Sequence, residues 1–214
     1  MFGGAGDDQI TVQVPLDLVE GGNGNDFIRY NSSTEGGGLT LSGGAVDDVI
    51  VHLTLNSTPE HLNSLTIDAG EGDDRLLSSA NIGPDADNSG DTLTDGSGAD
   101  SFELTFHHPD LTEPSRDAGI VTTITDFDPA EDSLLLVEDF QSGQESRVSL
   151  PSPARITGFE LVEAADGSFT DVIFQATATD TGSGTVTGTI RLAGTTGLTT
   201  ANIQIGPPNL TTTV

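Results

Sequence analysis

Five segments of the chain carry an aspartate at the sixth position of a glycine-rich turn, and carboxylates repeated in this way are suited to holding metal ions. The segments begin at residues 3, 21, 43, 69 and 95, and their sixth residues are Asp8, Asp26, Asp48, Asp74 and Asp100. Glycine at the first, second and fourth positions permits positive φ angles, which can turn backbone carbonyl oxygens towards a shared space. Calcium takes about six to eight oxygen ligands from carbonyls and carboxylates. The pattern therefore predicts a row of calcium-binding turns.

One such segment alone would favour an ordinary polar turn, since glycine, asparagine and aspartate are common turn residues. Five copies reverse that preference. The match is strongest at residues 3–8 and 21–26, and weaker where Val46, Ala69 or Asp95 replaces a glycine. The third segment, which ends at Asp48, is the one we expect to bind an ion least well.

Strands must flank these turns on both sides. An apolar residue follows each sixth-position aspartate by two positions, which places it on one face of a strand; these residues are Ile10, Ile28, Ile50, Leu76 and Phe102. Apolar residues before the later turns predict a returning strand; they are Leu39, Leu41, Leu65, Ile67 and Leu93. The turns are 18, 22, 26 and 26 residues apart. We expect the added residues, within 32–38, 56–63 and 81–90, to form loops at the opposite edge.

The repeated segments resemble the nonapeptide Gly-Gly-x-Gly-x-Asp-x-U-x of the repeats-in-toxin family, where U is a large apolar residue. The resemblance implies an all-β fold, a right-handed parallel β-roll or β-solenoid with calcium turns along one edge. It also implies that each ion lies between adjacent turns, so five turns would hold about four ions. The implied ligands are carbonyls and carboxylates of Gly3, Ala5, Gly6, Asp8, Gly21, Asn23, Gly24, Asp26, Gly43, Ala45, Asp48, Ala69, Glu71, Gly72, Asp74, Asp95, Ser97, Gly98 and Asp100.

The second half of the chain carries different signals. Residues 118–136 resemble the segment that closes such rolls, where Asp126 and Asp128 would complete a fifth ion site above Asp100; a solvated acidic turn at Pro129 is an equal alternative. Strand-like runs at 158–164, 170–178, 184–193 and 201–205 predict an antiparallel cap. We expect a calcium-binding roll over 1–136 and a β cap over 137–214, to which the resemblance adds an export signal.

Composition restricts the partners. The chain has 34 acidic and 6 basic residues, a net charge of −28 and no cysteine. This charge argues against nucleic acid and anionic membranes and favours a cation, although an acidic disordered tail or a salt-adapted surface would share it. There is no apolar leader at the N-terminus and no apolar run that could span a membrane.

No pattern of nucleophile, general base or catalytic metal stands out. His52, His61, His107 and His108 do not form a His-Glu-x-x-His motif. We therefore expect a binding module without enzymatic activity. The resemblance further implies a secreted bacterial protein that is exported by a type I transporter and folds on binding extracellular calcium. Two alternatives stay open: an adhesin or ice-binding surface, suggested by Thr40, Thr66 and Thr92, and a polysaccharide-binding or polysaccharide-modifying module.

Overall fold

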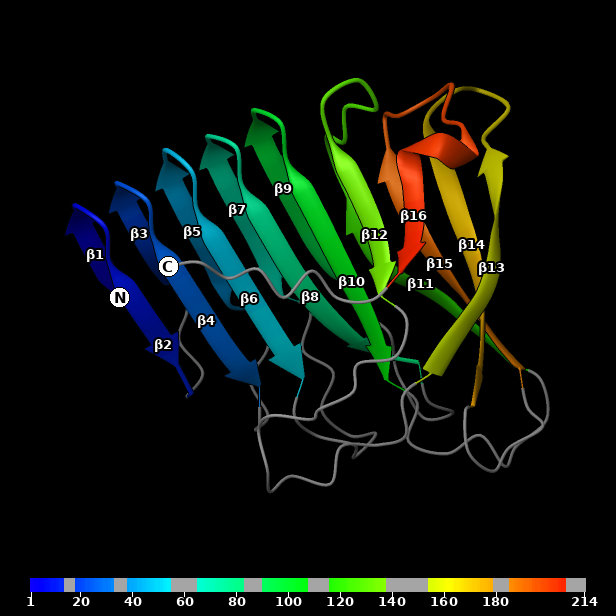
Figure 1. Ribbon diagram of the computed structural model, residues 1–214, viewed down its shortest axis with the longest axis horizontal. Helices are drawn as coiled ribbons and strands as arrows, with labels where there is room; N and C mark the ends of the chain where they lie inside the picture. The colour runs from blue at the N-terminus through cyan, green and yellow to red at the C-terminus, as the bar shows by residue number, and fades with distance from the viewer. Residues whose placement is uncertain are drawn as a thin grey trace.

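A computed structural model describes residues 1–13, 18–32, 38–54, 65–82, 90–107, 116–137, 154–178 and 185–206. These residues form β-strands almost throughout, with one short 3₁₀ helix (Figure 1). The strands are β1 Phe2–Ala5, β2 Gln9–Val12, β3 Leu18–Asn23, β4 Phe27–Ser32, β5 Thr40–Ala45, β6 Val49–Thr54, β7 Thr66–Glu71, β8 Arg75–Asn81, β9 Asp91–Ser97, β10 Ser101–His107, β11 Arg116–Ile124, β12 Ser133–Val137, β13 Ala154–Glu163, β14 Phe169–Ala178, β15 Thr185–Ala193 and β16 Ile203–Gly206; the helix η1 is Thr200–Asn202. Among the described residues, no helix is long and apolar enough to cross a membrane.

The strands alternate between two sheets. Odd-numbered strands β1 to β11 lie side by side in one sheet, and even-numbered strands β2 to β12 lie side by side in the other. All neighbours in these two series run parallel. From β1 to β9, each odd strand passes to the next even strand through a tight turn, and these turns follow one another along a single edge of the molecule (Figure 1). The predicted parallel β-roll is confirmed.

The repeat spacing sets the register of both sheets. The second-position glycines of successive turns pair across β1, β3, β5, β7 and β9, from Gly4 to Gly96. In the other sheet the apolar residues that follow the turns pair in the same way, from Ile10 to Phe102 and on to Leu134. These side chains and those of the odd strands, among them Leu41, Ile67 and Leu93, fill a thin core. The insertions expected at 32–38, 56–63 and 81–90 fall largely outside the described residues.

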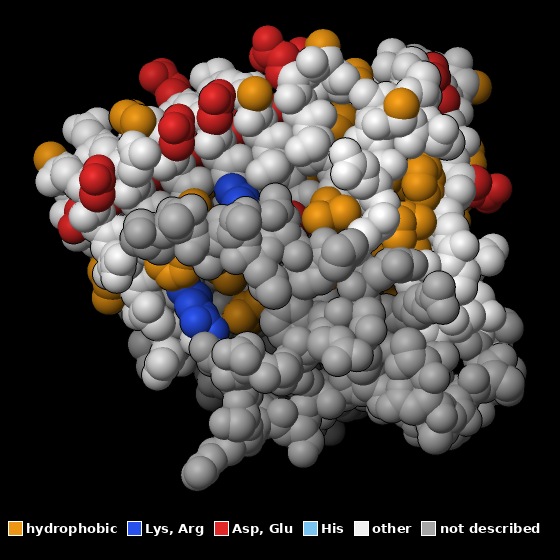
Figure 2. Space-filling view, viewed as in Figure 1, with side chains coloured by type: hydrophobic (Ala, Val, Ile, Leu, Met, Phe, Trp, Pro, Cys, Tyr) orange, Lys and Arg blue, Asp and Glu red, His pale blue; other side chains and the backbone are white. Residues whose placement is uncertain are grey.

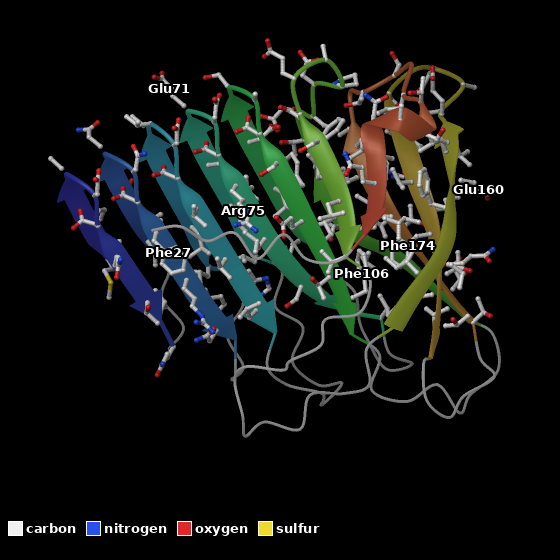
Figure 3. The ribbon with its side chains drawn as sticks, in the orientation of Figure 1. Phe27, Glu71, Arg75, Phe106, Glu160 and Phe174 are labelled. Atoms are coloured by element: carbon white, nitrogen blue, oxygen red, sulfur yellow. The ribbon has the colours of Figure 1, made fainter. Side chains whose placement is uncertain are left out.

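The C-terminal strands close both sheets. β15 pairs parallel with β11, and β14 and β13 follow antiparallel, as predicted for a cap. Phe106 of β10 stacks on Phe174 of β14 with ring centroids 4.2 Å apart, which joins the roll to the cap in the core (Figure 3). The last strand differs from expectation: β16 pairs parallel with β12 and extends the second sheet. The boundary expected between residues 136 and 137 lies inside β12.

A buried polar cluster lies inside the roll, at the end away from the tight turns. Asp91 Oδ1 accepts a hydrogen bond from the backbone N–H of Leu65, and Oδ2 accepts one from Ser78 Oγ and lies 3.1 Å from His52 Nδ1. The ring of Tyr30 stacks on His52. Both Ser78 and the His52 Nδ1 face the same carboxylate oxygen, whereas a catalytic triad needs serine and aspartate on opposite ring nitrogens. The cluster therefore organises rungs rather than activating a nucleophile.

Replacing Asp91 with alanine should destabilise the roll by about 3 kcal/mol, because the N–H of Leu65 and the hydroxyl of Ser78 lose a buried acceptor. Urea unfolding of Asp91→Ala in excess calcium would measure this loss. Asp68→Ala, a change to an exposed carboxylate of β7, is the control and should alter stability by less than about 0.5 kcal/mol. Equal stabilities for the two variants would contradict the role given to Asp91.

The outer face of the first sheet carries the predicted threonine ladder. Thr40, Thr66 and Thr92 pair in register, and Thr123 of β11 continues the row. The neighbouring row on that sheet contains Glu20, Ser42, Asp68 and Thr94. The face is therefore polar but interrupted by carboxylates, and the ladder by itself indicates only regular outward-facing strand positions.

Candidate metal centre

The sixth-position aspartates stack into a column along the turn edge. The backbone N–H of Asp8 donates to Asp26 Oδ1, and the same bond repeats from each aspartate to the next, at 2.7–2.8 Å up to Asp100. Asp26, Asp48, Asp74 and Asp100 are each at most 3% exposed. Further acidic side chains follow this edge on the surface (Figure 2). The structure thus brings together all five aspartates predicted from the repeat.

In four of the five aspartates of this column, the second carboxylate oxygen has no hydrogen-bond partner. Oδ2 of Asp8, Asp26, Asp48 and Asp74 is buried in each case without a donor. A buried carboxylate oxygen without a partner is costly, because it loses water and gains nothing in return. The free oxygens are aligned, one per rung, and each is a potential ligand for a cation.

A backbone carbonyl of the following rung faces each of the first three free oxygens. A Cβ built on Gly3 would lie 2.7 Å from both Asp8 Oδ2 and the carbonyl oxygen of Gly21. In the same way, a Cβ built on Gly21 would meet Asp26 Oδ2 and the carbonyl oxygen of Gly43. A Cβ built on Gly43 would meet Asp48 Oδ2 and the carbonyl oxygen of Ala69. We call these three places the repeat cradles. Each gathers a carboxylate oxygen and a carbonyl oxygen from adjacent rungs around a glycine.

Glycine permits positive φ at all three positions of the turn, but the structure gives these glycines two separate roles. Only the second and fourth positions have it, for example Gly22 at 122° and Gly24 at 120°. A side chain at the second position would also collide with the backbone of the preceding rung. For example, a Cβ added to Gly44 would collide with the backbone of Gly22. The first position needs glycine for another reason: a Cβ there would occupy the cradle.

Val46 is strained at the fourth position of the third turn. It is the one non-glycine residue with positive φ among the described residues, at 79°, and its side chain is 49% exposed. A left-handed backbone costs an L-residue about 1–2 kcal/mol, more than glycine costs through its greater freedom when unfolded. Val46→Gly should therefore raise the melting temperature by about 2–4 °C.

Differential scanning calorimetry in excess calcium would test the change at Val46. The matched control is Val162→Gly, because Val162 is also exposed, at 45%, but lies in an ordinary strand. That substitution should lower the melting temperature, since glycine weakens a strand interior. A fall in melting temperature for Val46→Gly would contradict the assignment of strain.

The third position, predicted to supply ligands, also takes part in backbone pairing between rungs. The third-position carbonyls of Asn23, Ala45 and Ser97 accept hydrogen bonds from fourth-position N–H groups of the preceding rung. Each keeps one lone pair, so these carbonyls are secondary candidates as ligands. Among the third-position side chains, that of Glu71 lies at the outer edge of its turn (Figure 3). The first-position carbonyls and the sixth-position carboxylates form the cradles themselves.

The column continues into a sixth turn through Asp132, which is not one of the two residues, Asp126 and Asp128, that the sequence suggested for a fifth ion site. The N–H of Asp100 donates to Asp132 Oδ1 at 3.0 Å, which is the same bond as in the earlier rungs. Asp128 is exposed and accepts from the N–H of Ala130 within its own turn. The prediction missed Asp132 because its turn lacks the glycine motif. A usable signal was present, since Leu134 follows Asp132 by two residues, as Ile10 follows Asp8.

The fifth rung differs from the others because Asp95 stands at its first position. Asp95 is 1% exposed, and its Oδ2 has no hydrogen-bond partner. Carboxylate oxygens of Asp95, Asp100 and Asp132 all lie within 4.8 Å of one another. Asp126, which was predicted as a ligand, accepts hydrogen bonds from the N–H groups of Asp95 and Gly96 beside this group.

Burial and mutual repulsion disfavour ionisation of these carboxylates. Loss of water around Asp48 raises its pKa to about 7, and the same cause raises the pKa of Asp74 and of Asp100 to about 6, with neighbouring carboxylates adding to each shift. Burial raises the pKa of Asp95 to about 9, assisted by Asp126 and Asp132. A cation in the column would supply the missing positive charge.

The donor set fits calcium in type. Every candidate ligand is a carboxylate or carbonyl oxygen, and no cysteine occurs in the chain. Hard cations such as calcium take oxygen ligands in irregular geometry, whereas zinc and copper sites use the nitrogen of imidazole or the sulfur of thiolate. His52 lies in the separate cluster with Ser78 and Asp91. The column therefore offers sites for a hard cation.

Neither a protein-family model nor a curated protein sequence matches this chain. Among solved structures, the chain is similar to the solution structure of the AlgE6R2 subunit from the Azotobacter vinelandii mannuronan C5-epimerase, with 20% sequence identity over 93% of each chain and a TM-score of 0.37. At this level of similarity, the fold assignment depends on the strand register of the chain itself.

Proposed function

We propose that this chain is a calcium-binding β-roll module whose folding depends on the ion. The observation that carries the proposal is the row of buried, unpartnered Oδ2 atoms on Asp8, Asp26, Asp48 and Asp74. A fold that buries aligned carboxylate charges without partners needs counter-charges at that place. The likeness of the turns to repeats-in-toxin nonapeptides supports calcium as the ion.

Calcium suits the cradles better than magnesium. Magnesium requires near-ideal octahedral geometry at about 2.0–2.1 Å and gives up its water reluctantly, whereas calcium accepts irregular sets of oxygens. The cradles take their ligands from two rungs whose spacing is fixed by strand pairing, about 4.8 Å apart. Such ligands cannot close around a small ion without breaking the register of the sheets.

The module serves outside the cell in this proposal, after export from a bacterium through a type I transporter. Its charge of −28 supports this, because it opposes compaction until cations bind, and the chain has no cysteine for disulfides that could stabilise it instead. Extracellular modules bind calcium with dissociation constants of about 10⁻⁴–10⁻³ M. The chain would remain unfolded at cytosolic calcium and fold on release.

Its role is binding and structural support rather than catalysis. The described residues place serine, histidine and aspartate together at Ser78, His52 and Asp91, but in a buried cluster centred on one carboxylate oxygen. The acidic groups along the turn edge are repeated at every rung, as ion ligands would be. No observation on the threonine face favours a second function.

Isothermal titration calorimetry with calcium tests the proposal, and Gly21→Ala locates the ions. The added methyl group should enter the cradle between Asp26 and the Gly43 carbonyl, while the φ angle of Gly21 is not in the positive range. The variant should bind at least one calcium ion fewer than the wild type. Gly158→Ala is the control, because a Cβ there meets nothing within 4 Å.

Wild-type protein should bind several calcium ions per chain and should bind magnesium far more weakly. Gly158→Ala should keep the wild-type number of ions. The proposal would be abandoned if the wild type bound no calcium at millimolar concentrations, or if Gly21→Ala, shown by circular dichroism to be folded, bound as many ions as the wild type.

A further inference from the structure

The end of the column beside the cap has a different chemistry from the repeat cradles. A repeat cradle gathers one carboxylate oxygen and one carbonyl oxygen around a glycine. At the fifth rung, Asp95 takes the place of that glycine and brings a carboxylate of its own. Oxygen atoms of Asp95, Asp100 and Asp132 lie within 4.8 Å of one another, and Asp126 adjoins them.

The Asp95 side chain is held in place but is not satisfied. Its Oδ1 accepts a hydrogen bond from the N–H of Gly96, while its Oδ2 is buried and has no partner. The residue is 1% exposed, so water does not compensate the free oxygen. An unpaired carboxylate oxygen among two further carboxylates gains a strong interaction when a cation lies between them.

The other two carboxylates are fixed by the backbone. Asp100 Oδ1 accepts from the N–H of Asp74 at 2.7 Å, and Asp132 accepts from the N–H groups of Asp100 and Asp128 at 3.0 and 2.6 Å. Ligands positioned before the ion arrives cost less entropy to organise on binding. Asp95 and Asp100 lie at the two ends of the fifth turn, and Asp132 lies at the end of the sixth, directly before β12.

We propose that Asp95, Asp100 and Asp132, with Asp126 beside them, form a terminal calcium site that binds its ion more tightly than the repeat cradles do. The proposal rests on the calcium-binding function given above and deepens it. Affinity at oxygen sites rises with the number of charged ligands, and this site has three carboxylates where a repeat cradle has one. We expect its dissociation constant to be at least about tenfold lower than that of the cradles.

The position of the site gives the tight ion a structural consequence. The turn that carries Asp126 and Asp132 also receives two hydrogen bonds from the C-terminal part: Thr195 Oγ1 donates to the Phe127 carbonyl, and Asn202 Nδ2 donates to the Pro129 carbonyl. An ion bound here joins the fifth rung to a turn that is itself tied to the cap. The terminal site therefore stays loaded, and keeps the roll joined to the cap, at calcium levels that empty the cradles.

Calcium titration of the full chain in chelator-buffered solutions tests the terminal site. Equilibrium dialysis should show one ion retained at free calcium concentrations at least about tenfold below those that fill the remaining sites. Asp95→Asn keeps the shape of the side chain and removes its charge, and Asp95→Gly restores the residue of the repeat cradles. Both variants should lose the tightly held ion and keep the weaker ones, whereas Asp68→Asn, an exposed control on β7, should bind as the wild type does.

The outcomes separate this inference from the proposed function. Weak sites of a single affinity in the wild type, or a tight ion that survives in both Asp95 variants, would overturn the terminal site and leave the calcium-binding roll in place. If the wild type binds one tight ion that Asp95→Asn loses, and neither the wild type nor any variant binds weaker ions, the terminal site would be supported and the repeat cradles overturned. The wild-type titration decides between one and two affinities even where a variant fails to fold.

Discussion

Removing calcium is expected to lower the melting temperature of this chain by about 20 °C or more, and to leave much of it unfolded at room temperature. At a calcium concentration one hundred times its dissociation constant, each site adds about 2.7 kcal/mol, so four sites contribute roughly 10 kcal/mol. The whole stability of a domain is about 5–15 kcal/mol. Without ions, the aligned Oδ2 atoms from Asp8 to Asp74 are left as buried charges with no partner.

Thermal unfolding followed by circular dichroism, with and without chelator, would measure this loss. Two controls isolate the ion: chelator saturated with excess calcium should restore the original melting temperature, and magnesium at the same concentration should restore little of it. Identical unfolding curves with and without chelator would mean that the column of carboxylates is stable without ions, contrary to the geometry of the cradles.

The second large effect is an opposite dependence on pH with and without calcium. In the ion-free fold, Asp48 has a pKa of about 7 and Asp74 and Asp100 of about 6, whereas an unfolded aspartate has a pKa of about 3.9. The folded state therefore holds more protons than the unfolded chain between about pH 4 and 7, so its stability falls as the pH rises through that window. Ion-free protein should melt at least about 10 °C higher at pH 5 than at pH 8.

Calcium reverses the sign, because it binds the ionised carboxylates that acid would protonate. Protein in excess calcium should melt at a lower temperature at pH 5 than at pH 8. Ion-free protein is best prepared on a chelating resin, since soluble chelators hold calcium weakly in acid. A melting temperature that falls on acidification in both preparations would contradict the burial of uncompensated carboxylates in the column.

Local repeats explain why most of the roll could be predicted from the sequence. The sixth-position aspartate and the apolar residue two positions later recur at every turn, so the register of Asp8, Asp26 and Asp48 follows once the rungs stack. The same spacing predicts the buried face from Ile10 to Phe102, which the structure confirms. These features depend on neighbouring residues and on the next rung only.

What could not be predicted depends on longer or less regular spacing. Asp132 lies 32 residues after Asp100, in a turn without the glycine pattern, and its place in the column appears only when β10 and β12 pair. Asp95 is among the ligands that the resemblance implies, but its turn reads in the sequence as a weakened repeat, and only the fold shows its carboxylate beside those of Asp100 and Asp132. The contact of His52 with Asp91 spans 39 residues and needs the register of both sheets.

Anomalous X-ray diffraction from crystals grown in calcium would locate each bound ion independently of its affinity. A row of calcium peaks is expected along the turn edge, spaced by about 4.8 Å as the rungs are. The peaks should lie beside Oδ2 of Asp8, Asp26 and Asp48, with a further one among Asp95, Asp100 and Asp132. Calcium peaks only at exposed carboxylates, with none along this column, would rule out the column of aspartates as the calcium-binding site.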